Sequence, residues 1–493
     1  MSEEKKPSAF TGFLRYFYGN FIVLILGFVS IPLITRLMST DEYGKSGMFT
    51  TAVTVIYIFA ILGMDQTYIR YYYKEGINRV ALMKQCLFPA LGIVGVLAII
   101  YSIFSDYANH FLFGQGGRDI TILVIAYTVI SVFERFMFLD IRMSQNGKLY
   151  SNLNIFSKVL YIGLLLIAFH FLGDNFRVVL YAMTLSLGIV TAYISLRFVM
   201  IHRKDDKTIE QNQTVSQKEL IKYGMPFIMV LLMEWLLSSC DRWSLRIWSG
   251  YHELGIYNAA MNIMSILLTF KATFVAFWSP VAMEKYEMDS EENCHLFFRK
   301  AFSITRFLCV LAAFGLILFR QIIAFILGGD YRSAVSVIPF LTLMPIFSIM
   351  FEITNQGIKF KNQNRYLNYA SFVAILCNLC GNALLVPRFG GVGAAFATGI
   401  TYMTYFVIGS FFSEKCYTVG YDYKKTILYG ILLILYAGIA TFVTGMLMSV
   451  ISGVLGILFV CIVDYKTFKE ILDFILQIFK RKKCEKSQAP SSH

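Results

Sequence analysis

Stretches of about 20 mainly apolar residues recur along the whole chain, and this feature restricts the possible folds more than any other. A stretch of this length crosses a bilayer as a helix, because a helix satisfies its backbone hydrogen bonds internally. We predict about fourteen spans, near residues 13–36, 47–68, 84–104, 119–140, 151–172, 177–198, 219–244, 255–280, 300–327, 333–356, 366–386, 391–412, 425–447 and 450–472. Only 15% of the residues are charged, whereas an average soluble domain carries roughly 25%. The sequence therefore predicts an all-α, polytopic membrane protein.

The loops between these spans alternate between strongly basic and nearly uncharged. Basic residues gather, for example, in the longest loop, His202–Gln217, and in the tail at Lys480-Arg-Lys-Lys483. Because basic loops stay in the cytoplasm, we predict that both termini are cytoplasmic and that the number of spans is even. The net charge of +13 is then explained by membrane topology, and nucleic-acid binding is not predicted.

The basic loop also divides the chain into two halves that carry a weak internal repeat. Glu253 lies 211 residues after Glu42 in a similar motif, and Glu352 lies 218 residues after Glu134. Six spans in each half give both halves the same orientation, so we expect two pseudo-symmetric six-helix bundles related by an axis along the membrane normal. The predicted segments are a cytoplasmic tail (1–12), the first bundle (13–200), a cytoplasmic linker (201–218), the second bundle (219–415), two extra transmembrane helices (416–472) and a basic cytoplasmic tail (473–493).

Several short motifs occur along the chain in a distinctive order. They are Pro32-LITRLMSTDEYGKSG, Leu62-GMDQTYIRYYYKE, Tyr223-GMPF, Ser239-CDRW, Leu254-GIYNAAMNI and Ala276-FWSPVAMEKY. Each motif is weak alone, but together they resemble the polysaccharide transport family. This family comprises the Wzx-like oligosaccharide flippases of the multidrug/oligosaccharidyl-lipid/polysaccharide (MOP) exporter superfamily. The resemblance extends over residues 13–415, and helix count is the main support for the last two spans.

The resemblance implies a central cavity between the two bundles, two extra helices at the C-terminus and transport by alternating access. It also implies the cargo, an undecaprenyl-pyrophosphate-linked oligosaccharide for cell-surface polysaccharide biosynthesis. This cargo would move from the inner to the outer leaflet of the bacterial cytoplasmic membrane. A polysaccharide polymerase and glycosyltransferases of the same pathway are the implied protein partners.

Span 219–244 carries two acids that should not face lipid. Glu234 and Asp241 lie on one stripe of a helix, and acids inside a membrane face other helices or a water-filled cavity. Either acid could bind a proton or sodium ion that drives transport, and no other cofactor is expected. In the repeat register these acids align with Val23 and Ser30, so the first half has no counterpart for either. We favour Glu234 as the ion-coupling residue and assign Asp241 to the motif at the outer end of the helix.

Lys271 lies in span 255–280, roughly 15 Å from the cytoplasmic end of that span at 1.5 Å per residue. It could form a neutralising pair with Glu234, or it could face the cavity and attract the lipid pyrophosphate. Both interpretations hold if the lysine exchanges partners during transport. Arg306, Arg135 and Arg15 are further candidates for the pyrophosphate, because lysine and arginine both bind phosphate oxygens well.

The remaining candidates are gate or structural residues. Glu134 and Glu352 are equivalent in the repeat and could bond across the bundle interface to gate the cytoplasmic opening. They could equally be interfacial acids that meet the basic loops. Arg242, next to Asp241, has a structural or a functional role, and Asp65 and Arg70 are predicted to anchor the end of the second span.

Catalytic and metal-binding motifs are missing from the sequence. It has no phosphate-binding loop, no G-x-S-x-G and no H-E-x-x-H, and its six histidines are dispersed. The nine cysteines are scattered through apolar spans, which favours buried single residues. We therefore predict a transporter with no metal site. The alternatives are a cation-coupled multidrug exporter of the same superfamily and, third, a membrane glycosyltransferase or polysaccharide polymerase, for which the short loops leave little room.

Overall fold

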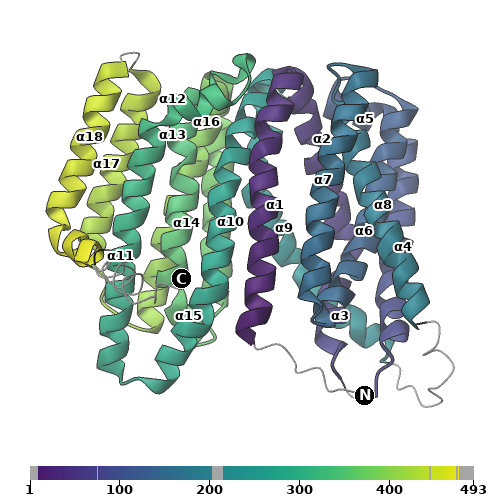
Figure 1. The fold of residues 1–493 in the computed structure, drawn as a ribbon, viewed down its shortest axis with the longest axis horizontal. Coiled ribbons are helices and arrows are strands. Elements are labelled where there is room, and N and C mark those ends of the chain that lie inside the picture. The colour runs from purple at the N-terminus through teal and green to yellow at the C-terminus, as the bar shows by residue number, and fades with distance from the viewer. Residues whose placement is uncertain (1–8, 75, 203–214, 444–445, 474–475, 477–493) are drawn as a thin grey trace, which may run out of the picture. The chain divides into compact units, whose positions relative to one another are not determined.

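The protein is described by a computed structural model that covers residues 9–74, 76–202, 215–443, 446–473 and 476. All regular elements in these ranges are helices, which confirms the predicted all-α class (Figure 1). Eleven of the described helices are long and apolar enough to cross a membrane, and a bent pair at the C-terminal end would make twelve. The count of fourteen is not confirmed and stays a prediction.

Two compact units are defined by internal contacts. The N-terminal unit comprises the described residues up to Ile266, together with Leu327–Tyr331 and Val386–Gly391. The C-terminal unit comprises the other described residues. The division therefore falls inside a helix, α10 (Gly250–Met288), and not at the linker 201–218. The predicted division into equal six-helix bundles stays a prediction.

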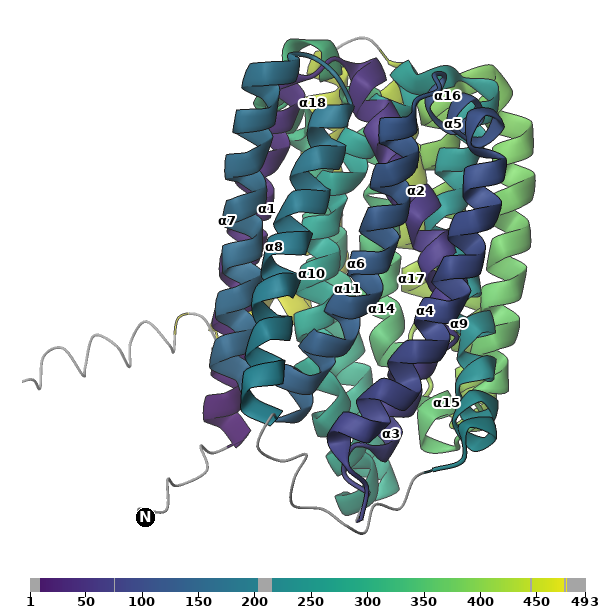
Figure 2. The ribbon, with the colours of Figure 1, turned by 90° about the vertical axis from the view of Figure 1, so that its right-hand side faces the viewer.

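The N-terminal unit is built from α1 to α9 and the first part of α10. The bounds are α1 (Ala9–Leu37), α2 (Thr40–Ile61), α3 (Met64–Tyr71), α4 (Arg79–Ile103), α5 (Ser105–Phe113), α6 (Arg118–Met143), α7 (Gly147–Leu172), α8 (Arg177–His202) and α9 (Gln217–Trp248). Helix α7 packs against α1 and α8, and α2 packs against α4, α6 and α9 (Figure 2). The long helices thus lie side by side, as a polytopic bundle requires.

Glycines permit close approach between helices of the N-terminal unit. Gly63 has a positive φ of 66° in the turn between α2 and α3, and an added Cβ there would collide with the carbonyl oxygen of Gly224 on α9. An added Cβ on Gly255 of α10 would likewise collide with the carbonyl oxygen of Thr40 on α2. Small residues allow this proximity, which stabilises helix pairs in a membrane by van der Waals contact.

The C-terminal unit contains the rest of α10 and the helices that follow it. The bounds are α11 (Glu291–Leu318), α12 (Arg320–Ile326), α13 (Ala334–Leu341), α14 (Leu343–Thr354), α15 (Gln356–Phe360), α16 (Arg365–Cys416), α17 (Tyr423–Phe442) and α18 (Met446–Val463). Helix α11 packs against α14, α17 and α18. Helix α16 runs through the predicted spans 366–386 and 391–412, and Gly390 breaks its helical geometry between them.

Helix α14 is the most enclosed helix of this unit. Every one of its residues except Glu352 is buried. Its sequence explains this position, because apolar side chains such as Ile346, Phe347 and Met350 surround the helix on all sides. An acid on such a helix needs a partner from a neighbouring element.

Candidate functional site

The partner of Glu352 is Lys271. The Lys271 Nζ lies 3.0 Å from Glu352 Oε1 and donates a hydrogen bond of 2.8 Å to Ser348 Oγ. Ser348 and Glu352 are one helical turn apart on α14, so both face α10, which carries Lys271. The structure therefore brings together two residues for which separate roles are predicted above, a phosphate ligand and a gate acid.

A second lysine binds the same carboxylate. Lys359 on α15 places its Nζ 3.4 Å from Glu352 Oε2, and Asn355 donates a hydrogen bond of 3.2 Å to that oxygen. The side chains of Lys271 and Lys359 are 26% and 31% exposed, whereas that of Glu352 is 13% exposed. The cluster thus holds two cations for one anion. Its excess positive charge and its accessible ammonium groups suit an anionic ligand.

The N-terminal unit contains a different ion pair, between Asp65 on α3 and Arg135 on α6. Arg135 donates from Nε and Nη2 to Asp65 Oδ2 at 3.1 and 2.7 Å. The Asp65 side chain is 4% exposed and that of Arg135 is 36% exposed. Asp65 is therefore paired with Arg135, and not with Arg70, which is exposed at the end of α3. The pairing ties α3 to α6, while the guanidinium keeps an accessible edge for the predicted phosphate contact.

The two acids of α9 have different surroundings. Asp241 is 1% exposed and accepts a hydrogen bond of 2.6 Å from the hydroxyl of Tyr257 on α10. Arg242 donates a hydrogen bond of 2.9 Å to Asn258, also on α10. These contacts favour a structural role for the Asp241-Arg242 motif, namely holding α9 to α10. Glu234, in contrast, is exposed in the N-terminal unit, and its coupling role stays a prediction.

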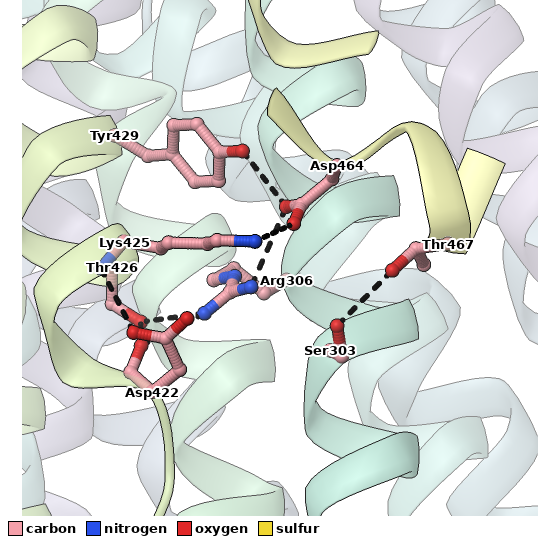
Figure 3. A network of polar contacts seen from close by, with 8 residues as sticks. All are labelled: Ser303, Arg306, Asp422, Lys425, Thr426, Tyr429, Asp464 and Thr467. Atoms are coloured by element: carbon pink, nitrogen blue, oxygen red, sulfur yellow. Dashed lines mark hydrogen bonds and ion pairs between the residues drawn. The ribbon is translucent and has the colours of Figure 1, made fainter. Parts of the chain in front are cut away.

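Arg306 has partners that the sequence did not predict. Its side chain is 2% exposed and lies 3.4 Å from Asp464, in a network that also contains Lys425 and Tyr429 (Figure 3). It also donates a hydrogen bond of 2.8 Å to the carbonyl oxygen of Asp422. These contacts favour a structural role over the predicted contact with phosphate.

Three further sequence predictions stay predictions. Glu134 is partly buried on α6, but a bond between Glu134 and Glu352 would join the two units and stays a prediction. The same holds for the predicted pair of Lys271 with Glu234. Arg15 falls in the first part of α1, where its side chain lies outside the described residues.

Sequence reasoning missed Ser348, Lys359 and Asp464. A signal for Asp464 was present, since it is an acid inside the predicted span 450–472. Ser348 could not be recognised from the sequence, because serine is common in membrane helices. Its importance comes from its hydrogen bond with Lys271. Within the described ranges, no three histidine, cysteine, aspartate or glutamate side chains lie close enough to hold a metal ion.

Charges that pair on membrane-spanning helices of a polytopic bundle are typical of transport pathways and other functional sites. Among solved structures, the fold is similar to the lipid II flippase MurJ in its inward closed conformation. That match has a TM-score of 0.65 and 16% sequence identity, and it covers 92% of this chain and 99% of the other. It is also similar to an inward-facing MATE multidrug transporter of the MOP superfamily, with a TM-score of 0.55, 17% identity and coverage of 82% and 95%.

Sequence comparison identifies the family to which the chain belongs. Residues 10–284, more than half of the chain, match the family described as polysaccharide biosynthesis protein, and the chain belongs to that family. An uncharacterized membrane protein of Methanocaldococcus jannaschii is 24% identical over 90% of this chain and 92% of its own length. A "probable low-salt glycan biosynthesis flippase" of Haloferax volcanii is 18% identical over 84% of this chain and 85% of its own length. The predicted membership of a family of polysaccharide-related membrane proteins is confirmed.

Proposed function

We propose that this protein is a flippase for an undecaprenyl-pyrophosphate-linked oligosaccharide. It moves this cargo from the inner to the outer leaflet of the bacterial cytoplasmic membrane, for cell-surface polysaccharide biosynthesis. The observation that carries the proposal is the cluster of Lys271 and Lys359 around Glu352, because a diphosphate can bind Lys271 while the carboxylate keeps a second cation beside it. Membership of a polysaccharide biosynthesis family supports the saccharide part of the cargo.

In the proposed mechanism of transport, Lys271 exchanges its carboxylate partner, Glu352, for the pyrophosphate of the cargo. In the absence of cargo, Glu352 neutralises Lys271 and keeps its ammonium group satisfied inside the unit. The arriving pyrophosphate competes with the carboxylate for Lys271, while Lys359 stays beside Glu352 and limits the cost of freeing it. Since the bound and free states differ in this ion pair, cargo can shift the balance between the inward-facing and outward-facing conformations. In this proposal Glu352 acts as a gate acid.

The proposal is tested by deleting the gene and measuring which lipid-linked sugar accumulates in the cytoplasmic leaflet. We expect an undecaprenyl-pyrophosphate-linked oligosaccharide to accumulate there and surface polysaccharide to be lost, and the restored gene to reverse both. An unchanged distribution of that lipid between the leaflets would contradict the proposal. The polymerase and glycosyltransferases of the same pathway are the proposed partners, and both chain termini are proposed to be cytoplasmic.

A cation-coupled multidrug exporter is the second candidate, and the similarity in fold to a MATE transporter keeps it open. The exposed acid Glu234 would suit a cationic drug or a coupling ion. The two candidates are separated by measuring efflux of a cationic dye from cells that express the protein. The flippase proposal expects no efflux above that of cells without the gene.

Replacing Glu234 by glutamine tests whether transport is coupled to an ion. We propose that Glu234 binds a proton or a sodium ion, because its carboxylate lies on a membrane helix and is exposed in its unit. Glutamine keeps the shape but cannot be charged, so the dependence of translocation on pH or sodium should disappear in Glu234→Gln. The matched control is Glu219→Gln on the same helix, which should keep the wild-type dependence. A dependence that survives in Glu234→Gln would assign coupling to another group.

A further inference from the structure

The C-terminal end of the described chain contains a sharp bend. Helix α18 has 18 residues, which at 1.5 Å per residue is just long enough to cross the hydrocarbon core. Beyond it, the segment Tyr465–Asp473 forms another helix, called here the terminal helix, at 85° to Leu447–Val463. If α18 runs across the bilayer, a helix at this angle runs along the membrane surface. The predicted span 450–472 is thus bent at Asp464 and is not one straight helix.

The bend is fixed by contacts on both sides of it. Asp464 at the break is 3% exposed and accepts hydrogen bonds of 2.8 Å from both Lys425 and Tyr429 (Figure 3). Beyond the break, Thr467 lies 3.2 Å from Ser303 on α11. The terminal helix is therefore held in place by the unit, and its direction is a property of the fold.

Side chains on the outer side of the terminal helix combine apolar and basic character. Tyr465 and Leu472 are 59% and 43% exposed, and a spacing of seven residues places them on one stripe. Lys466 and Lys469 are exposed beside them, together with one acid, Asp473, so the lysines outnumber the acid there. Glu470 is neutralised by Lys300, at 2.9 Å. An apolar stripe flanked by lysines is the pattern of helices that lie in the headgroup region of a membrane.

We propose that the terminal helix is a binding surface for anionic lipid headgroups. Tyr465 and Leu472 insert among the acyl chains, and Lys466 and Lys469 bind the lipid phosphates. The sequence beyond the helix adds the basic residues Lys480-Arg-Lys-Lys483, and clusters of several basic residues next to a membrane helix are attracted to anionic lipids. This surface is separate from the cluster around Glu352 and does not depend on the proposed cargo.

The test places a tryptophan at the apolar stripe of the full-length protein. The Tyr465→Trp variant is reconstituted in vesicles of phosphatidylcholine mixed with phosphatidylglycerol, and either lipid carries bromine on its acyl chain to quench nearby tryptophan. The fluorescence of the reconstituted wild type is subtracted. We expect both brominated lipids to quench the added tryptophan, and brominated phosphatidylglycerol to quench it more strongly at equal mole fraction.

Two charge variants decide whether the lysines cause that preference. Adding Lys466→Gln and Lys469→Gln to Tyr465→Trp should remove the preference for phosphatidylglycerol and leave quenching by phosphatidylcholine. Adding Lys218→Gln and Lys222→Gln, which neutralise an exposed pair of lysines on α9, should leave the preference intact. Equal quenching by the two lipids in Tyr465→Trp, or a preference that survives the first pair of substitutions, would overturn the proposal. Quenching by neither lipid would show that the helix lies in water.

Discussion

The Lys271→Ala variant should lose transport by about 100-fold, because a hydrogen bond to a charged group contributes up to about 3 kcal/mol and each factor of ten corresponds to about 1.4 kcal/mol. The amount of protein in the membrane should stay near normal. Glu352 keeps Lys359 and Asn355 as partners when Lys271 is removed, so the buried carboxylate is not left alone. Transport is measured as the appearance of the lipid-linked sugar in the outer leaflet, alongside the protein level in the membrane fraction.

Two further variants give this experiment its controls. Lys285→Ala removes a lysine from the same helix, where it pairs with Asp289 and is 40% exposed, and should change transport little. Lys271→Arg keeps the charge and should retain part of the activity, since arginine also binds phosphate but has a different shape. Full activity of Lys271→Ala would rule out the proposed role of this lysine in cargo binding.

Replacing Asp464 by asparagine should lower the free energy of unfolding by about 3–5 kcal/mol, the usual effect of removing one partner of a buried ion pair. Asparagine preserves the shape of the side chain but leaves Arg306, which is 2% exposed, without a counter-charge. Lys425 loses the same partner but is 37% exposed and can reach solvent. The measurement is thermal or denaturant unfolding of the purified protein in detergent.

The matched control for this loss of stability is the nearby surface ion pair between Lys300 and Glu470. Glu470→Gln removes the partner of Lys300, whose side chain is 65% exposed, and should cost less than about 1 kcal/mol. Replacing both buried charges, as Arg306→Met with Asp464→Leu, should recover most of the stability, because the only charge left without its partner is that of Lys425, which can reach solvent. An Asp464→Asn variant as stable as the wild type would mean that Arg306 does not depend on this carboxylate.

Much of the architecture follows from local properties of the sequence. The apolar spans predict membrane helices, because their length matches the bilayer and lipid offers no other partner for backbone hydrogen bonds. The ordered motifs between residues 13 and 415 identified the family to which the chain belongs. Elements whose bounds depend on a bend were predicted less well. The break at Asp464 is marked in the sequence by the charged residues that begin there, Asp464, Lys466, Lys469 and Glu470, but the predicted span runs through them to residue 472.

The candidate site was predicted in its residues but not in its connections. Lys271, Glu352, Asp65 and Arg135 were all recognised as charges inside apolar spans. Their partners were not, since Lys271 is bound to Glu352 and Asp65 to Arg135. A charged residue inside a membrane helix indicates that a partner of opposite charge or a hydrogen-bonding group lies nearby. Its position along the chain does not identify the neighbouring helix that carries this partner.

The sequence alone thus determined the class of this protein, its family and the set of charges that carry its proposed function. These properties depend on composition and on short motifs, which the order of residues contains directly. Only the tertiary structure decided which charges neutralise one another and which keep an accessible edge. Helix packing makes that choice, because it places α14 against α10 and α3 against α6, and so brings together residues that lie 70 or more positions apart in the chain.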